Sequence, residues 1–161
     1  MTRTTSVQGR AFIEHNEGCS LTAYPDPPGQ STQFSIGFGH LLDAGETYAN
    51  GITQDEADAL LSADLRPREA CVNSKVQVDI TQAQFDALVD FVYNEGMDAF
   101  SGSTTLRRLN AGDYQGAADA LLMWDRVMRR GQLVEDGGLL ARRVAERKMF
   151  LSDVPPSPDV A

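Results

Sequence analysis

Apolar residues recur at two different spacings along this chain, and the spacing separates one short mixed segment from several helical ones. Over most of the sequence they return every three or four positions, which is the repeat of a helix with one buried face. In residues 18–50 turn-forming residues interrupt the pattern and short runs alternate, which predicts two or three short strands. The pattern predicts helices over 1–17, 53–72, 81–94, 100–110, 113–128 and 139–151, and a loop over 129–138.

Two of these helices have clearly marked first turns. Thr53 is followed three positions later by Glu56, and Thr81 by Gln84, and both pairs are capping boxes. Pro67 lies inside the first of the two helices and should bend or break it, because proline has no amide hydrogen to donate. The second has apolar residues around much of its circumference, so we expect it to be a buried central helix.

Residues 14–40 hold two carboxylates on either side of a break in local structure. Glu17 ends the first predicted helix, because Gly18 follows it in the manner of a helix C-terminal glycine. Asp26 stands nine positions later, in a proline- and glycine-rich turn between two predicted strands. A helix end and a hairpin can place two acids across a gap, as acid and base chemistry on one bond requires. Spacing alone leaves open an ordinary solvent-exposed pair, since the chain has 23 acidic residues among 161.

Length and composition narrow the class of protein. A chain of 161 residues with 42% hydrophobic residues is long enough for one core. It has no run of about 18 apolar residues, and its first ten residues lack the apolar stretch of a secretory signal. We therefore expect no membrane insertion and residence in the cytoplasm. Cys19 and Cys71 are expected as free thiols, and His15 and His40 have no partners at zinc-ligand spacing, so we expect no metal ion and no cofactor.

The charge is unevenly distributed. The net charge of −9 does not favour nucleic acid as a partner. Residues 126–148 nevertheless contain seven basic and three acidic side chains. One interpretation is a solvated helix face. The other is a basic flank that meets an anionic substrate or balances catalytic carboxylates.

The segment around the two acids resembles the phage-type lysozymes. The family signature is a Glu, eight further residues, an Asp, and then a Thr before a Gly-x-Gly-His run. Glu17, Asp26 and the run over 37–40 match it, while Ser35 stands where the family has Thr. The strings over 52–64 and 138–146 also resemble the family, so the resemblance covers nearly the whole chain. It implies an α+β, mainly α, lysozyme-like fold.

The resemblance also implies how the chain is divided. It predicts one muramidase domain over 1–151, in which a long helix joins a small β-hairpin lobe to a larger helical lobe. The small lobe is expected over about 18–52, and the helical lobe over about 73–151 together with the N-terminal helix. Residues 152–161 are expected to form a disordered, proline-rich tail.

The residue roles follow from the same resemblance. Glu17 is expected to be the general acid, with a raised pKa, while Asp26 stays ionised and Ser35 holds a water molecule. Leu41, Tyr93 and Asn94 are expected to contact the substrate. Two further features follow from the family pattern. We expect an ion pair between His40 and Asp64, and we note that Glu95 occupies a position that is usually apolar.

The implied activity is hydrolysis of bacterial peptidoglycan at the β-1,4 bond between N-acetylmuramic acid and N-acetylglucosamine, with inversion. A binding protein with little or no activity on the same fold stays open, as does a lytic transglycosylase that uses Glu17 alone. The protein is expected to be a monomer that stays in the host cytoplasm until a separate export or pore function releases it to the cell wall.

Overall fold

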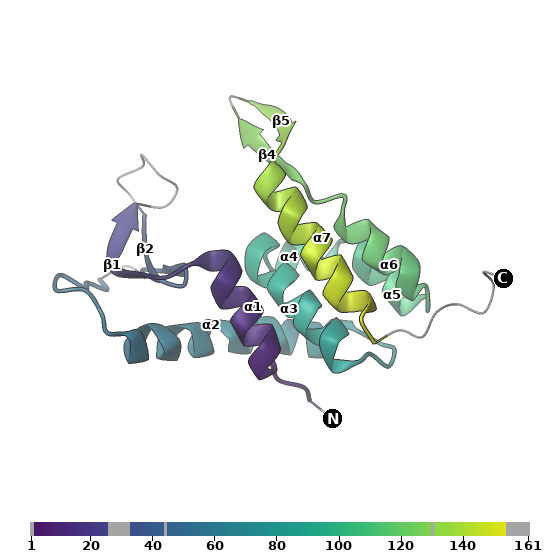
Figure 1. Ribbon diagram of the computed structural model, residues 1–161, viewed down its shortest axis with the longest axis horizontal. Helices are drawn as coiled ribbons and strands as arrows, with labels where there is room; N and C mark the ends of the chain where they lie inside the picture. The colour runs from purple at the N-terminus through teal and green to yellow at the C-terminus, as the bar shows by residue number, and fades with distance from the viewer. Residues whose placement is uncertain (1, 26–32, 44, 130, 154–161) are drawn as a thin grey trace. The chain divides into compact units, whose positions relative to one another are not determined.

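The structure is a computed structural model, and it describes residues 2–25, 33–43, 45–129 and 131–153. Helices predominate, with one three-stranded sheet and one two-stranded sheet (Figure 1). The elements are α1 (Val7–Glu17), β1 (Ser20–Pro25), β2 (Phe34–Gly37), β3 (His40–Leu41), α2 (Gln54–Lys75), α3 (Gln82–Glu95), α4 (Met97–Ser101), α5 (Thr104–Asn110), α6 (Tyr114–Leu121), β4 (Arg126–Arg129), β5 (Gln132–Glu135) and α7 (Gly137–Leu151).

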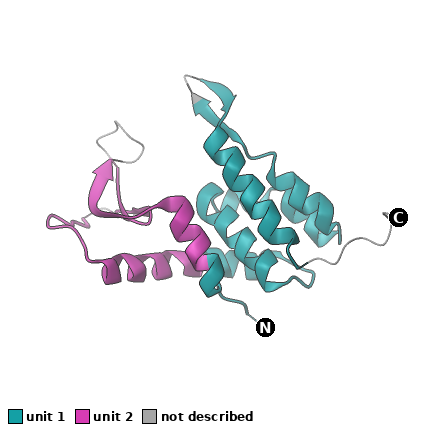
Figure 2. Ribbon diagram, in the orientation of Figure 1, with its two compact units in different colours: residues 1–9, 68–161 teal, residues 10–67 magenta. Residues whose placement is uncertain are grey.

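The chain forms two compact units, shown in Figure 2. We call residues 10–67 the β unit, and residues 1–9 with 68–161 the helical unit. Helices α1 and α2 each continue from one unit into the other. The predicted bounds of the two lobes stay a prediction. From residue 154 on, the predicted tail lies outside the described residues.

The β unit is built on an antiparallel sheet in the order β1-β2-β3. The predicted hairpin and the returning strand are therefore confirmed. Gly37, at the end of β2, has a φ of 63°. It packs closely against α2: a Cβ built on this glycine would lie 3.5 Å from the Cβ of Ala57. Gly51 also requires glycine: its φ is 74°, and a Cβ would lie 2.6 Å from the carbonyl oxygen of Leu21. The buried apolar residues of this unit are Ile13, Ile36, Phe38, Ile52, Ala57, Leu61 and Leu65.

The helical unit has α3 at its centre. Nine consecutive residues of α3 are buried, and its predicted capping box is present, since Thr81 and Gln84 exchange both hydrogen bonds. Helix α7 packs on α3 and α6, and α5 packs on α6. The ring of Phe91 makes edge contacts with Phe100 and Trp124 at centroid distances of 6.3 and 5.4 Å. The central buried helix expected from the apolar pattern is therefore confirmed.

The first helix is shorter than predicted. It begins at Val7, and the preceding residues run without helical structure. Polar side chains hold this extended segment in place. The backbone of Arg3 exchanges hydrogen bonds with the Asn73 side chain at 2.9 Å, and the backbone amide of Thr5 donates to Glu69 at 2.8 Å. These bonds offer the backbone an alternative to helix hydrogen bonds, which the apolar pattern could not reveal.

The prediction of a helix to residue 128 followed by a loop was wrong. Helix α6 ends at Leu121, and β4 and β5 form an antiparallel hairpin at the start of α7 (Figure 1). Val127 stands opposite Val134 and Met128 opposite Leu133, pairs that suit a strand better than a helix. Because the two strands are only four residues long, their alternation is too brief to distinguish from a helical pattern.

Two smaller expectations also needed correction. Helix α2 continues through Pro67 to Lys75, so the proline does not break it, and the alternative of a bend stays a prediction. The helix predicted over 100–110 is two helices, α4 and α5, that meet at Gly102 and Ser103. The Ser103 side chain accepts a hydrogen bond from the amide of Leu106 at 3.0 Å, so it starts the second helix as an N-cap.

Candidate active site

Glu17 lies where α1 ends, as predicted. Gly18 follows with a φ of 67°, and its amide donates to the carbonyl of Glu14 at 3.0 Å, which closes the last turn. The carboxylate of Glu17 turns toward the sheet: a Cβ built at Gly39 would lie 3.5 Å from its Oε2, and its Oε1 is buried. The helix end and the Gly-x-Gly-His run therefore meet at this carboxylate. Burial of one oxygen disfavours the charged form of a carboxyl group.

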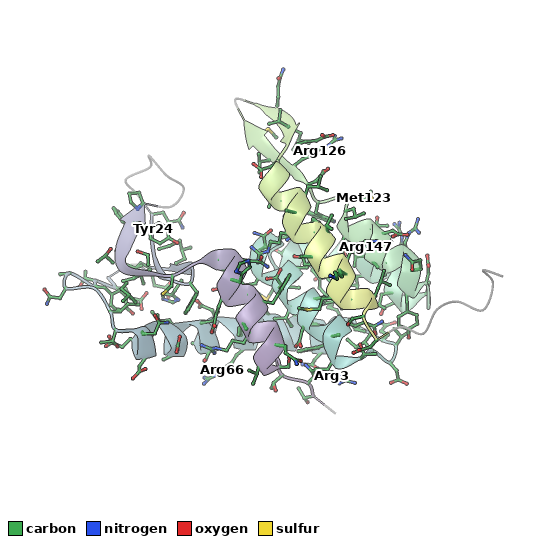
Figure 3. The ribbon with its side chains drawn as sticks, in the orientation of Figure 1. Arg3, Tyr24, Arg66, Met123, Arg126 and Arg147 are labelled. Carbon is green, nitrogen blue, oxygen red and sulfur yellow. The ribbon has the colours of Figure 1, made fainter. Side chains whose placement is uncertain are left out.

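Ser35 lies in the middle of the sheet. It stands opposite Tyr24 of β1 and Leu41 of β3, and it is fully buried. Leu41, by contrast, is 46% exposed, so its side chain is accessible to a ligand. Tyr24, labelled in Figure 3, stands next to the last residue of β1. Asp26 follows directly but lies outside the described residues, so the separation of the two proposed catalytic carboxyls stays a prediction.

His40 ties β3 to α2. Its Nδ1 lies 3.0 and 3.1 Å from the two carboxylate oxygens of Asp64, so the predicted pairing of these two side chains is confirmed. Its Nε2 lies 3.5 Å from Glu46, a second carboxylate that the sequence did not suggest. The backbone amide of Asp43 donates a hydrogen bond to the Glu46 carboxylate. This bond lowers the pKa of Glu46, and His40 lowers it by a smaller amount. These contacts fix the last residue of the Gly-x-Gly-His run, whose Gly39 lies beside the carboxylate of Glu17.

Tyr93 and Asn94 belong to the helical unit, at the C-terminal end of α3. Gly96 ends the helix with a φ of 93°, and its amide donates to the carbonyl of Val92. The guanidinium of Arg68 lies over the Tyr93 ring, 4.8 Å from its centroid. Cation–π contact of this kind restrains the ring, and Tyr93 is half-buried. The predicted contact of Tyr93 and Asn94 with substrate stays a prediction.

Glu95, which stands where the family usually has an apolar residue, is bound by an arginine of α7. Its Oε1 accepts a hydrogen bond from Nη1 of Arg143 at 2.9 Å, and Arg143 is fully buried. Asp90, Arg142 and Glu146 complete this cluster between α3 and α7. The two arginines and Glu146 stand in the string over 138–146 that resembles the family, but the sequence predicted neither their contacts nor the part played by Asp90. One signal was available: Asp90 stands between apolar residues in a helix predicted to be buried on most sides, where a charge requires a partner.

Two of the basic residues over 126–148 need a different interpretation from either one that the sequence suggested. The side chains of Arg142 and Arg143 are 9% and 0% exposed, so they are neither a solvated face nor a surface that meets substrate. Both are internal counter-ions to carboxylates of α3. Arg126 and Arg147, at 56% and 35% exposed, do fit the solvated interpretation (Figure 3).

Comparison with known proteins decides the family. Residues 14–146 match the phage lysozyme family. The chain belongs to this family. It is 40% identical over 150 residues to the endolysin of Salmonella phage P22, and 38% identical over 149 residues to the endolysin of Acyrthosiphon pisum secondary endosymbiont phage 1. Each alignment covers 91% of this chain and 97% of the relative.

Solved structures show the same fold. The endolysin from Escherichia coli O157:H7 phage FAHEc1 aligns with a TM-score of 0.86 at 34% identity, over 98% of this chain and 99% of that one. The muramidase domain of SpmX from Asticaccaulis excentricus aligns with a TM-score of 0.84 at 38% identity, over 92% and 99%. The lysozyme-like α+β fold is therefore confirmed. This member of the phage lysozyme family is a glycoside hydrolase, a muramidase that degrades peptidoglycan.

Three further features complete the description of this phage lysozyme. Cys19 and Cys71 are both free thiols. In the described part of the chain no group of three or more His, Cys, Asp or Glu side chains could hold a metal ion. Nor is any helix in those residues both long enough and apolar enough to span a membrane.

Proposed function

We propose that the chain cleaves the β-1,4 bond between N-acetylmuramic acid and N-acetylglucosamine, with Glu17 as general acid and Asp26 as the second carboxylate. The observation that carries the proposal is the placement of the Glu17 carboxylate. It stands at a helix end against Gly39, with Oε1 buried. A carboxyl group in such a place keeps its proton more readily than one in water, and cleavage requires a proton for the leaving oxygen.

Asp26 supplies the second half of the reaction in this proposal. It follows β1 in sequence, in a segment that the proline and glycine residues predict to be a turn, and a carboxylate in an open turn would stay ionised, as the second group must be. It then acts as general base for a water molecule on the opposite face of the sugar. We propose inversion, which requires the two carboxyls to be about 6.5–9.5 Å apart so that water fits between them. Analysis of the anomeric form of the first product shows directly whether the reaction inverts the configuration.

Ser35 is proposed to orient that water. Ser35 is fully buried, so the water that its hydroxyl orients in this proposal must be enclosed as well. Leu41, exposed on the neighbouring strand, is proposed to contact the glycan, together with Tyr93 and Asn94 of the helical unit. We expect a monomer that is held in the host cytoplasm until a separate function gives it access to the wall.

The experiment that tests the acid is Glu17→Gln, assayed by loss of turbidity of permeabilised Gram-negative cells. We expect the rate to fall by at least about 10²-fold, because general acid catalysis contributes about 10²–10⁴. The matched control is Glu14→Gln on the same helix. Glu14 pairs with Arg10 at 2.7 Å and should keep normal activity. Normal lysis by a folded Glu17→Gln protein would disprove the assignment.

The burial of Ser35 favours one alternative reaction on the same bond. A lytic transglycosylase uses no water, so it needs neither Ser35 at an accessible position nor Asp26. The variant Asp26→Asn separates the two reactions. Loss of turnover supports hydrolysis, and unchanged turnover with anhydro-muramic product ends supports transglycosylation. A wild-type protein that binds peptidoglycan without any turnover would indicate the binding protein.

A further inference from the structure

Six polar side chains form a cluster between α3 and α7 in the helical unit. Five of the six can carry a charge, and four of these five side chains are at most 9% exposed. Arg142 donates to both carboxylate oxygens of Asp90, at 3.0 and 2.8 Å. The members are Asp90, Asn94 and Glu95 from α3 and Arg142, Arg143 and Glu146 from α7.

Arg143 is the centre of this cluster. Its Nη1 donates to Glu95 at 2.9 Å, and its Nη2 donates to Glu146 at 2.6 Å and to Oδ1 of Asn94 at 2.9 Å. Its guanidinium also lies 5.1 Å from the centroid of the Phe91 ring. The planar fork of an arginine fixes the direction of each bond, so the partners on α3 are fixed as well.

These bonds decide how the amide of Asn94 is oriented. A guanidinium has donors only, so the amide atom that faces it must be the oxygen. The nitrogen, Nδ2, then points in another direction and remains a donor. We propose that Arg143 is a positioning residue that sets the amide of Asn94 so that Nδ2 donates to an acyl oxygen of the substrate. The proposal rests on the proposed function, in which Asn94 contacts peptidoglycan.

The charge count explains why Glu95 is not apolar here. The two arginines face three carboxyl groups, those of Asp90, Glu95 and Glu146. Burial, followed by a hydrogen bond with Asp90, raises the pKa of Glu146 to about 10. With Glu146 protonated, two positive and two negative charges remain and the cluster is neutral. Glu95 is the second of those negative charges, so an apolar residue would leave Arg143 without an ionised partner.

Protonation also gives the remaining oxygen of Glu146 a role. In the described residues Oε2 of Glu146 is buried and accepts no hydrogen bond. When it carries a proton it becomes a donor, and the neighbouring acceptor is the carboxylate of Asp90. The groups that face Glu146 are Asp90 from α3 and Arg142 and Arg143 from its own helix. On α6, which also packs against α7, the carboxylate of Asp119 is bound by Arg147 instead.

The test measures kcat and KM on soluble peptidoglycan fragments. For Arg143→Met we expect KM to rise about tenfold, the effect of one lost hydrogen bond to substrate, with kcat unchanged. Asn94→Asp should raise KM to the same extent, because it keeps an acceptor for Arg143 but lacks the donor. The matched control is Arg147→Met on the same helix, labelled in Figure 3. Arg147 pairs with the exposed Asp119 at 2.7 Å, and its loss should leave KM unchanged.

Two variants of Glu95 keep the proposal testable if Arg143→Met fails to fold. The Glu95 side chain is 21% exposed, and Leu and Gln are close to Glu in volume, so either replacement should disturb packing less than loss of the fully buried Arg143 side chain. We expect Glu95→Leu to raise KM about threefold, because Arg143 loses one partner, and Glu95→Gln to fall between that variant and the wild type. Equal KM values for the wild type, Glu95→Leu and Asn94→Asp would overturn the proposal.

A second measurement does not depend on activity. The NMR order parameter of the Asn94 side-chain amide reports whether its orientation is fixed. We expect a high value in the wild type and in Arg147→Met, and a lower one in Glu95→Leu and Arg143→Met. If the wild-type protein failed to hydrolyse peptidoglycan, the proposed function would be wrong, while this measurement would still decide the role of Arg143. An amide that is equally ordered in all four proteins would contradict it.

Discussion

The two units hold their charged residues in different ways. In the β unit, His40 and Asp64 form a pair whose side chains are 15% and 19% exposed, with Glu46 on the other ring nitrogen. In the helical unit, the side chains of Arg143 and Glu146 are both 0% exposed. Water can still reach the first pair and replace a lost contact. It cannot reach the second, so every charge there must be balanced by another protein group.

This difference separates two ways of fixing a site. The run that ends at His40 is held mainly by its backbone, through strand pairing and a glycine packed against α2, and the ion pair adds to that. The end of α3 is held by buried side chains in a neutral cluster. We therefore expect the helical unit to be sensitive to changes in charge, and the β unit to tolerate them.

The largest effect is expected from Asp90→Ala. This change leaves Arg142 buried without its bidentate partner, which costs about 3–5 kcal/mol in the free energy of unfolding. Urea unfolding of the helical signal measures it. The matched control is Asp119→Ala, which removes a partner of Arg147 at a side chain that is 51% exposed. That variant should lose less than about 1 kcal/mol. Similar losses for both would show that burial does not distinguish these ion pairs.

The second largest effect is expected from Glu146→Gln, which should change how stability depends on pH. The pKa of Glu146 is raised from its ordinary value of 4.5 to about 10 in the folded protein, so the folded state keeps a proton that the unfolded chain releases. Its contribution to stability is fully present below pH 4.5 and is lost as the pH rises toward 10. Gln resembles the protonated form, accepting from Arg143 and donating to Asp90. We expect Glu146→Gln to match the wild-type melting temperature near pH 4.5 and to exceed it increasingly at higher pH.

The control for this prediction is Glu135→Gln, at a side chain that is 77% exposed on β5. Its melting temperature should follow the wild type at every pH. A Glu146→Gln protein that is less stable than the wild type at neutral pH would show that Glu146 is ionised when folded. The neutral charge count of the cluster would then be wrong.

The comparison also shows which parts of the structure the sequence could predict. The pair of His40 and Asp64 was expected because both stand in motifs of the phage lysozyme family. The capping box at Thr81 could be predicted from four consecutive residues, since both of its hydrogen bonds are local. The same holds for the end of α1 at Glu17, where Gly18 is the signal. Features of this kind depend on neighbours in sequence or on a known pattern.

The contacts of the charged cluster could not be predicted in that way, although Arg142, Arg143 and Glu146 stand in the string over 138–146 that resembles the family. Arg143 stands 49 residues from Asn94, and Arg142 stands 52 from Asp90. Arginines in a basic segment are usually exposed, so composition favoured a solvated face. The β4–β5 hairpin was missed for a related reason, because its strands are short and their apolar residues are mostly exposed. In both cases packing decides, and the local sequence carries little signal.

The smallest effect is expected from Asp64→Asn in the β unit. The change removes the charge of one partner, yet an amide oxygen can still accept from His40, and Glu46 still lies 3.5 Å from the other ring nitrogen. We expect a loss of about 1 kcal/mol or less in the free energy of unfolding. The measurement is urea unfolding, with the double variant Asp64→Asn, Glu46→Gln to show how far the two carboxylates replace each other. A loss comparable to that of Asp90→Ala would mean that the pair of His40 and Asp64 contributes as much to the free energy of unfolding as a fully buried ion pair. The β unit would then depend on charge rather than on its backbone.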